Sequence, residues 1–188
     1  YQMYKENKVD VTPEIAGLLC SAILSDTLVY RSPTCTETDK AAAEELAAIA
    51  GIKTQDYAME MFAAGSDLSS KSPEEIFYQD FKKFVVGEQT FGVGQITAMT
   101  GRELTAIKEK LIPYMQKAMA AHEVSMLFFM LTNIVEESTE LIFYGENSAS
   151  IVERAFHIEL EDEHSCQLEE VVSRKKQVIP ALVTAVQK

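Results

Sequence analysis

Apolar positions near the start of the chain recur at helical spacing. Thr12-Pro13-Glu14 combines an N-cap residue, a proline at the first helical position and a carboxylate in the first turn, which predicts a helix over about residues 12–28. Apolar side chains occupy nearly every side of that helix. We therefore expect it to be buried over most of its surface.

Two further helices are predicted before a polar segment. Thr36 and Asp39 have the spacing of a capping box and open an alanine-rich helix that ends at Gly51. A third helix is predicted over residues 54–64. Residues 64–70 are small and polar, which predicts a boundary or hinge between two parts of the chain.

The rest of the chain mixes helix and strand patterns. A capping box with proline at residues 72–75 predicts a short helix, and β-rich stretches at 83–86 and 90–99, separated by Gly87, predict a hairpin. Another capping box opens a long helix over residues 100–122, which must accommodate Pro113.

The last third predicts two strands, a helix, a short strand and a terminal helix, over residues 125–135, 140–144, 150–156, 158–160 and 175–186. The whole pattern predicts an α/β fold: helices come first, and an α/β domain with a mixed β-sheet flanked by helices follows.

Composition narrows the class of protein. The formal net charge of -12 argues against a nucleic-acid partner, because binding to a phosphate backbone needs a basic face. No apolar run reaches the roughly 20 residues that cross a bilayer, so we expect no membrane partner. Three widely spaced cysteines fit neither a disulfide framework nor a zinc site, which indicates the cytoplasm. The absence of an initiating methionine suggests a piece of a longer protein.

A basic cluster stands out in this acidic chain. Arg174 and Lys175 follow Ser173 and precede an apolar helix, so Ser173 can cap the helix while the cations face one anion. An arginine fork and a mobile lysine charge suit a phosphate. A solvated basic turn that balances nearby acidic residues explains the same pattern, and both interpretations stay open.

Two other residues are candidates. Asp26 lies between Ser25 and Thr27 near the end of an apolar helix, where it is either a solvated helix end or an oxygen ligand for Mg²⁺ or Mn²⁺. Lys82 lies between aromatic residues at an element boundary. Most such lysines are surface residues with packed stems, so the residues alone favour a structural role for Lys82.

Three segments together resemble a known family. Leu24-Ser25-Asp26-Thr27, Ser32-Pro33-Thr34-Cys35-Thr36 and Ser173-Arg174-Lys175-Lys176-Gln177-Val178 occur in the order found in manganese-dependent (family II) inorganic pyrophosphatases. In that family a DHH domain carries the metal site, and a smaller DHHA2 domain closes over it. The resemblance covers essentially the whole chain.

The resemblance implies roles for the candidates. Asp26 matches the last metal-binding aspartate of the DHH domain, and Lys82, Arg174 and Lys175 match residues that hold diphosphate; Lys176 is adjacent. In the complete enzyme, Mn²⁺ (or Mg²⁺ or Co²⁺) would activate a water for attack on phosphorus, and the cations would neutralise substrate charge. A homo-oligomer is also expected.

Most of the family's metal-binding motifs do not occur in these residues. Residues 1–65 therefore resemble the end of a DHH domain plus a linker, residues 66–188 resemble a DHHA2 domain, and we expect the chain alone to be inactive. Two alternatives stay open. One is an exopolyphosphatase or another phosphohydrolase of the DHH family, and the other is a non-catalytic anion-binding module.

Overall fold

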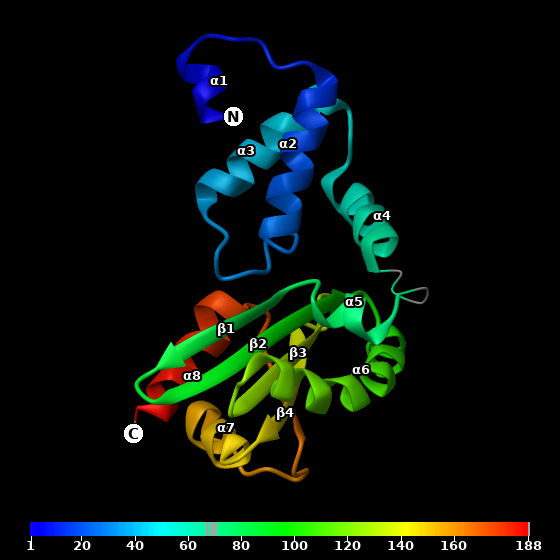
Figure 1. The fold of residues 1–188 in the computed structure, drawn as a ribbon. Helices are drawn as coiled ribbons and strands as arrows, with labels where there is room; N and C mark the ends of the chain where they lie inside the picture. Colours follow the sequence, from blue (N-terminus) through cyan, green and yellow to red (C-terminus); the bar gives the residue numbers. More distant parts are fainter. Residues whose placement is uncertain (67, 69–70, 188) are drawn as a thin grey trace. The chain divides into compact units, whose positions relative to one another are not determined.

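The chain forms two compact units, Tyr1–Gly65 and Ser66–Lys188, in a computed structural model that describes residues 1–66, 68 and 71–187 (Figure 1). Each unit has a hydrophobic core of its own. The predicted hinge at residues 64–70 includes residues 67, 69 and 70, which lie outside the described residues.

The first unit is helical. Its helices are α1 (Gln2–Glu6), α2 (Pro13–Asp26), α3 (Glu37–Ala50) and α4 (Thr54–Ser66). The predicted caps are present: the Thr12 side chain accepts from the Ile15 N–H, and the capping box of Thr36 and Asp39 starts α3. Gly51 ends α3 in the left-handed conformation, with φ of 69°. The sequence pattern did not indicate α1.

Burial of α2 differs from the expectation. Only one stripe of the helix is buried, formed by Ala16, Cys20 and Leu24, whereas Leu18 is 68% exposed. The reason is that α3 packs along one side of α2 within the described residues. The prediction that α2 is buried over most of its surface is therefore wrong for the described chain.

The second unit is built on a mixed five-stranded sheet in the order β1-β2-β3-β4-β5. The strands are β1 (Phe81–Val86), β2 (Gln89–Ala98), β3 (Met126–Asn133), β4 (Ser138–Gly145) and β5 (Ser165–Glu169). β2 and β3 are parallel, and the other neighbouring pairs are antiparallel. The predicted α/β class with a mixed sheet is confirmed.

Helices cover both faces of this sheet (Figure 1). One face carries α5 (Pro73–Phe77) and α6 (Gly101–His122), which contains Pro113 as predicted. The other face carries α7 (Ser148–Phe156), the π-helical turn η1 (Arg174–Val178) and α8 (Ile179–Val186). All eight residues of β3 are buried, because β3 lies in the middle of a sheet that is covered on both sides.

The end of the chain departs from the prediction in three places. Residues 158–160 form no strand; Ile158 and Leu160 pack against the core without joining the sheet. The fifth strand is Ser165–Glu169, in which only Leu168 is buried, so it lacks the apolar alternation by which a strand is recognised. The terminal helix begins with the π-helical turn η1, one residue before the predicted start.

Candidate functional site

The basic cluster lies where the last loop of the chain enters η1. Ser173 is the N-cap residue, and its Oγ accepts a hydrogen bond of 3.3 Å from the Lys176 N–H, as the sequence predicts. Lys175 and Lys176 are exposed, whereas Arg174 is only 8% exposed. The turn therefore presents two lysines to solvent, whereas neighbouring residues cover most of the arginine.

Gln177 fixes the loop that precedes this turn. Its Oε1 accepts from the backbone N–H groups of Val172 (3.0 Å) and Ser173 (2.9 Å), and its Nε2 donates to the Glu170 carbonyl oxygen (2.6 Å). One side chain thus satisfies three backbone groups of the loop. These hydrogen bonds hold the backbone next to the cations in one conformation.

A row of polar side chains ties the same loop to the sheet. Gln95 on β2 donates to the Val172 carbonyl oxygen (3.0 Å) and to Thr132 Oγ1 (3.1 Å) on β3. Thr132 is hydrogen-bonded to Thr139 on β4, which donates to the Val171 carbonyl oxygen. These buried and half-buried groups satisfy one another, so they specify where the loop crosses the sheet.

Arg174 reaches from η1 to the start of β1. Its Nη1 donates to the Asp80 carbonyl oxygen (2.6 Å) and, at 3.4 Å, to the Val93 carbonyl oxygen. Its Nη2 donates to Asp80 Oδ1 at 2.7 Å, which forms an ion pair. The guanidinium group is thereby held against the first residues of the β1–β2 hairpin.

Lys82 belongs to the same corner of the unit. It is exposed on β1 and lies opposite Val93 in the antiparallel ladder. Paired residues point to the same face of a sheet, and Val93 belongs to the core beneath η1 and α8. Lys82 therefore projects from the face that carries η1, two residues after Asp80, the partner of Arg174.

Asp26 lies in the first unit, at the exposed end of α2. Its carbonyl oxygen accepts from Thr34 Oγ1 at 3.4 Å, and Thr34 is hydrogen-bonded to Ser32 at 2.8 Å. Residues 28–30 between them are non-glycine residues with φ of 49°, 53° and 68°. Three consecutive left-handed residues are strained, and such strain persists where the surrounding structure over-determines it.

The described residues do not form a metal site by themselves. No group of three histidine, cysteine, aspartate or glutamate side chains in the described ranges could hold a metal ion. Asp26 alone would supply the oxygen of a single residue, whereas Mn²⁺ and Mg²⁺ need several ligands. The residues present therefore do not fit a complete manganese centre.

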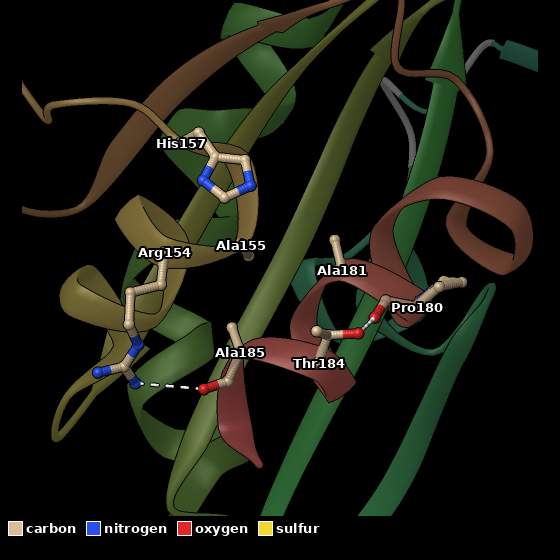
Figure 2. Close-up of a pocket in the computed structure, with 7 residues that line it drawn as sticks. All are labelled: Arg154, Ala155, His157, Pro180, Ala181, Thr184 and Ala185. Carbon is tan, nitrogen blue, oxygen red and sulfur yellow. Dashed lines mark hydrogen bonds between the residues drawn. The ribbon is translucent and has the colours of Figure 1, made fainter. Parts of the chain in front are cut away.

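A cavity of about 460 Å³ lies elsewhere in the second unit, between α7 and α8 (Figure 2). Its lining includes Arg154, His157 and Thr184, and Arg154 Nη2 donates to the Ala185 carbonyl oxygen at 3.3 Å. Figure 2 shows the arginine side chain extending toward the end of α8. Neither Lys82 nor the cations of η1 line this cavity, so it is separate from the candidate site.

The sequence interpretation missed the residues that hold Arg174 and the loop before η1 in place. Asp80 precedes Lys82 by only two positions, so the sequence alone places the two residues near each other. Its pairing with Arg174, 94 residues away, required the fold. Gln95 carried no signal, because a half-buried glutamine in an apolar strand has many possible partners.

The fold and the comparisons agree on the class of domain. The second unit is an α/β domain with a mixed sheet, and a family model described as the DHHA2 domain matches residues 59–185. The chain belongs to the DHHA2 domain family.

Similar proteins extend beyond the region that the family model matches. A manganese-dependent inorganic pyrophosphatase of Methanothrix thermoacetophila is 42% identical over 187 residues, which cover 99% of this chain and 60% of the relative. One of Bacillus subtilis is 40% identical over 184 residues, covering 98% and 59%. The resemblance inferred from the motifs is confirmed, and the chain spans about three fifths of the length of these relatives.

A solved structure shares the fold of the chain. A Methanococcus jannaschii protein, crystallised as a candidate family II inorganic pyrophosphatase, superposes with a TM-score of 0.87 and 34% identity. The match covers 100% of this chain and 63% of that one.

Proposed function

We propose that this chain is the diphosphate-binding part of a manganese-dependent inorganic pyrophosphatase. One observation carries the proposal: Lys82 and the cations Arg174 and Lys175 come from distant parts of the sequence to one corner of the sheet. They do so in a chain with a net charge of -12, where an anion site must be built locally. The relatives of this chain bear the corresponding name.

Each cation has a distinct part in this proposal. Lys175 is exposed at the start of η1 and supplies a mobile charge to a phosphate oxygen. Arg174 is already bound by Asp80 through Nη1 and Nη2, and no hydrogen bond among the described residues uses its Nε. Its remaining donors can therefore face a phosphate in a fixed direction. Lys82 adds positive charge from β1, next to η1.

The division of labour between the two units is also a proposal. Residues 1–65 would be the end of a DHH domain, with Asp26 as one ligand of Mn²⁺ (or Mg²⁺ or Co²⁺), and residues 66–188 would supply the substrate cations. The bound metal would provide an activated water for hydrolysis of diphosphate to two phosphates. The remaining ligands would come from residues outside this sequence.

Location and partners follow from the same proposal. No helix among the described residues is long and apolar enough to span a membrane. We propose a cytoplasmic enzyme that acts on free diphosphate, has neither nucleic-acid nor membrane partners, and assembles as a homo-oligomer. The exposed apolar residues Leu18 and Ile49 of the first unit support the assembly.

Two other functions compete with hydrolysis of diphosphate. An exopolyphosphatase would use the same cations on a longer chain of phosphates, and a non-catalytic module would bind an anion without cleaving it. The names of the relatives favour diphosphate over longer polyphosphates.

A chimeric protein separates these functions. This chain is joined to the part of the Bacillus subtilis relative that it does not match, and phosphate release is measured with Mn²⁺. We expect release from diphosphate, little from longer polyphosphates, and loss of activity with a chelator. The complete relative serves as the positive control, and circular dichroism verifies folding. Faster cleavage of longer chains would support the exopolyphosphatase, and a folded but inactive chimera would contradict the proposal.

A further inference from the structure

Asp80 is a residue to which neither the motifs nor the comparisons give a role. It lies between α5 and β1, and its side chain is about half exposed, whereas that of its partner Arg174 is nearly buried. The Asp80 carbonyl oxygen accepts both from Arg174 Nη1 at 2.6 Å and from the Gln95 N–H at 3.1 Å. Asp80 therefore contacts the guanidinium group with its backbone and its carboxylate together.

The geometry of this pair determines the orientation of Arg174. Two acceptors of one residue engage both terminal nitrogens, and the Val93 carbonyl oxygen adds a longer contact at 3.4 Å. A planar guanidinium group with both terminal nitrogens bound cannot rotate freely. The edge that includes Nε consequently keeps one direction.

The ion pair of Asp80 and Arg174 also joins the two segments that carry the cations. Asp80 immediately precedes β1, the strand that carries Lys82, and Arg174 begins the turn that carries Lys175. The pair thus joins β1 to η1 at the point where both present lysines. Gln95 binds the Asp80 carbonyl oxygen through its backbone and the loop before η1 through its side chain, so this connection has a second support.

We propose that Asp80 is a positioning residue: it holds Arg174 so that the free edge of the guanidinium group, with Lys82 and Lys175, forms one preorganised site for diphosphate. This inference rests on the proposed function. Preorganised donors bind an anion without a cost of reorganisation, which is the main benefit of such sites.

Whether substitution of Asp80 weakens or tightens the binding of diphosphate separates a positioning role from simple charge repulsion. A carboxylate beside an anion site repels the anion, so removing its charge alone should tighten the binding of diphosphate. Loss of positioning should weaken it. Asp80→Asn removes the charge with little change of shape, and Asp80→Ala also removes the side-chain acceptor.

Glu140→Gln is the matched control. Glu140 forms an ion pair with Lys108 of α6, and α6 covers the opposite face of the sheet from η1. The substitution removes the same charge and also breaks an ion pair, but it leaves Arg174 untouched. Any effect that the two variants share is therefore not due to positioning.

The experiment is calorimetric titration of the full chain and its variants with diphosphate and Mn²⁺, beside nitrogen-15 spectra of the arginine side chains without ligand. We expect Asp80→Asn to weaken binding about tenfold, because loss of the charge-assisted hydrogen bond that orients Arg174 outweighs the loss of repulsion, and Asp80→Ala to weaken it further. Glu140→Gln should leave the affinity within about twofold. The terminal guanidinium signals of Arg174 should show slow rotation in the wild type and lose it in Asp80→Ala.

Two results would overturn the inference in different ways. Equal or tighter diphosphate binding by both Asp80 variants would mean that Asp80 does not position the site. Slow rotation that persists in Asp80→Ala would mean that other groups hold Arg174, whether or not diphosphate binds. Absence of binding by the wild type would contradict the proposed function, and the spectra would still decide whether Asp80 holds the arginine.

Discussion

Replacing Lys175 by alanine in the active chimera should lower kcat/KM for diphosphate by about 10²–10³, the effect of removing one preorganised electrostatic donor. Lys175 is exposed at the start of η1, so the substitution should leave folding unchanged. The loss should appear in kcat as well as KM if the lysine neutralises charge that develops in the transition state. Steady-state phosphate release over a range of diphosphate concentrations measures both parameters.

Lys176→Ala is the control for this prediction. Lys176 is adjacent, equally charged and also exposed, but its N–H is used by the Ser173 cap. We expect a reduction of kcat/KM of less than about tenfold, which corresponds to the loss of a distant charge. Equal effects of the two substitutions would mean that the turn contributes only its general positive charge, and the specific role of Lys175 would be wrong.

Replacing Gly145 by alanine should destabilise the second unit by about 2–5 kcal/mol, the sum of backbone strain and overpacking. Gly145 ends β4 opposite Met126 with φ of 111°, a conformation that residues with a side chain rarely adopt. A Cβ atom there would lie 2.2 Å from the Ser125 carbonyl oxygen, which is backbone and cannot rotate away. Urea unfolding measures the loss of unfolding free energy, and hydrogen exchange of the β3 and β4 amides shows whether the loss falls on the second unit.

Gly101→Ala tests whether the destabilisation is specific to Gly145 or follows from any replacement of glycine by alanine. Gly101 is the first residue of α6, and no atom would lie within 4 Å of an added Cβ. Alanine favours the helix and reduces the entropy of the unfolded chain, so we expect a gain of about 0.4–1 kcal/mol. A Gly145→Ala protein as stable as the wild type would show that the end of β4 can rearrange.

Local signals explain why much of the fold was predictable. Capping boxes at Thr36 and Thr100 marked helix starts, because the same side chains that form the cap are readable in the sequence. Gly87 and its flanking β-rich segments marked the hairpin of β1 and β2. These features depend on residues within a few positions of one another.

Non-local features were missed or wrong for the opposite reason. β5 is a polar edge strand that pairs with β4 among the described residues, so its existence depends on pairing rather than on its own pattern. The burial of α2 depends on what packs against it, which periodicity does not reveal. Residues 158–160 carry apolar side chains that pack against the core without joining the sheet, and the local pattern does not distinguish the two outcomes.

The candidate site shows the same limit. Ser173 was identified as a cap from its position alone, and the structure places its side chain there. The interpretation of Arg174 as a residue free to face an anion was incomplete, because its ion pair with Asp80 spans 94 residues of sequence. The resemblance to a family predicted a role for the cations, and the structure adds how one of them, Arg174, is held.

Calorimetric titration of this chain with diphosphate and Mg²⁺, beside the Arg174→Ala, Lys175→Ala double variant, tests the central proposal most directly. We predict that the wild-type chain binds diphosphate and that the double variant, folded by circular dichroism, loses this binding. Equal binding by the two proteins would contradict the placement of the diphosphate site at the start of η1.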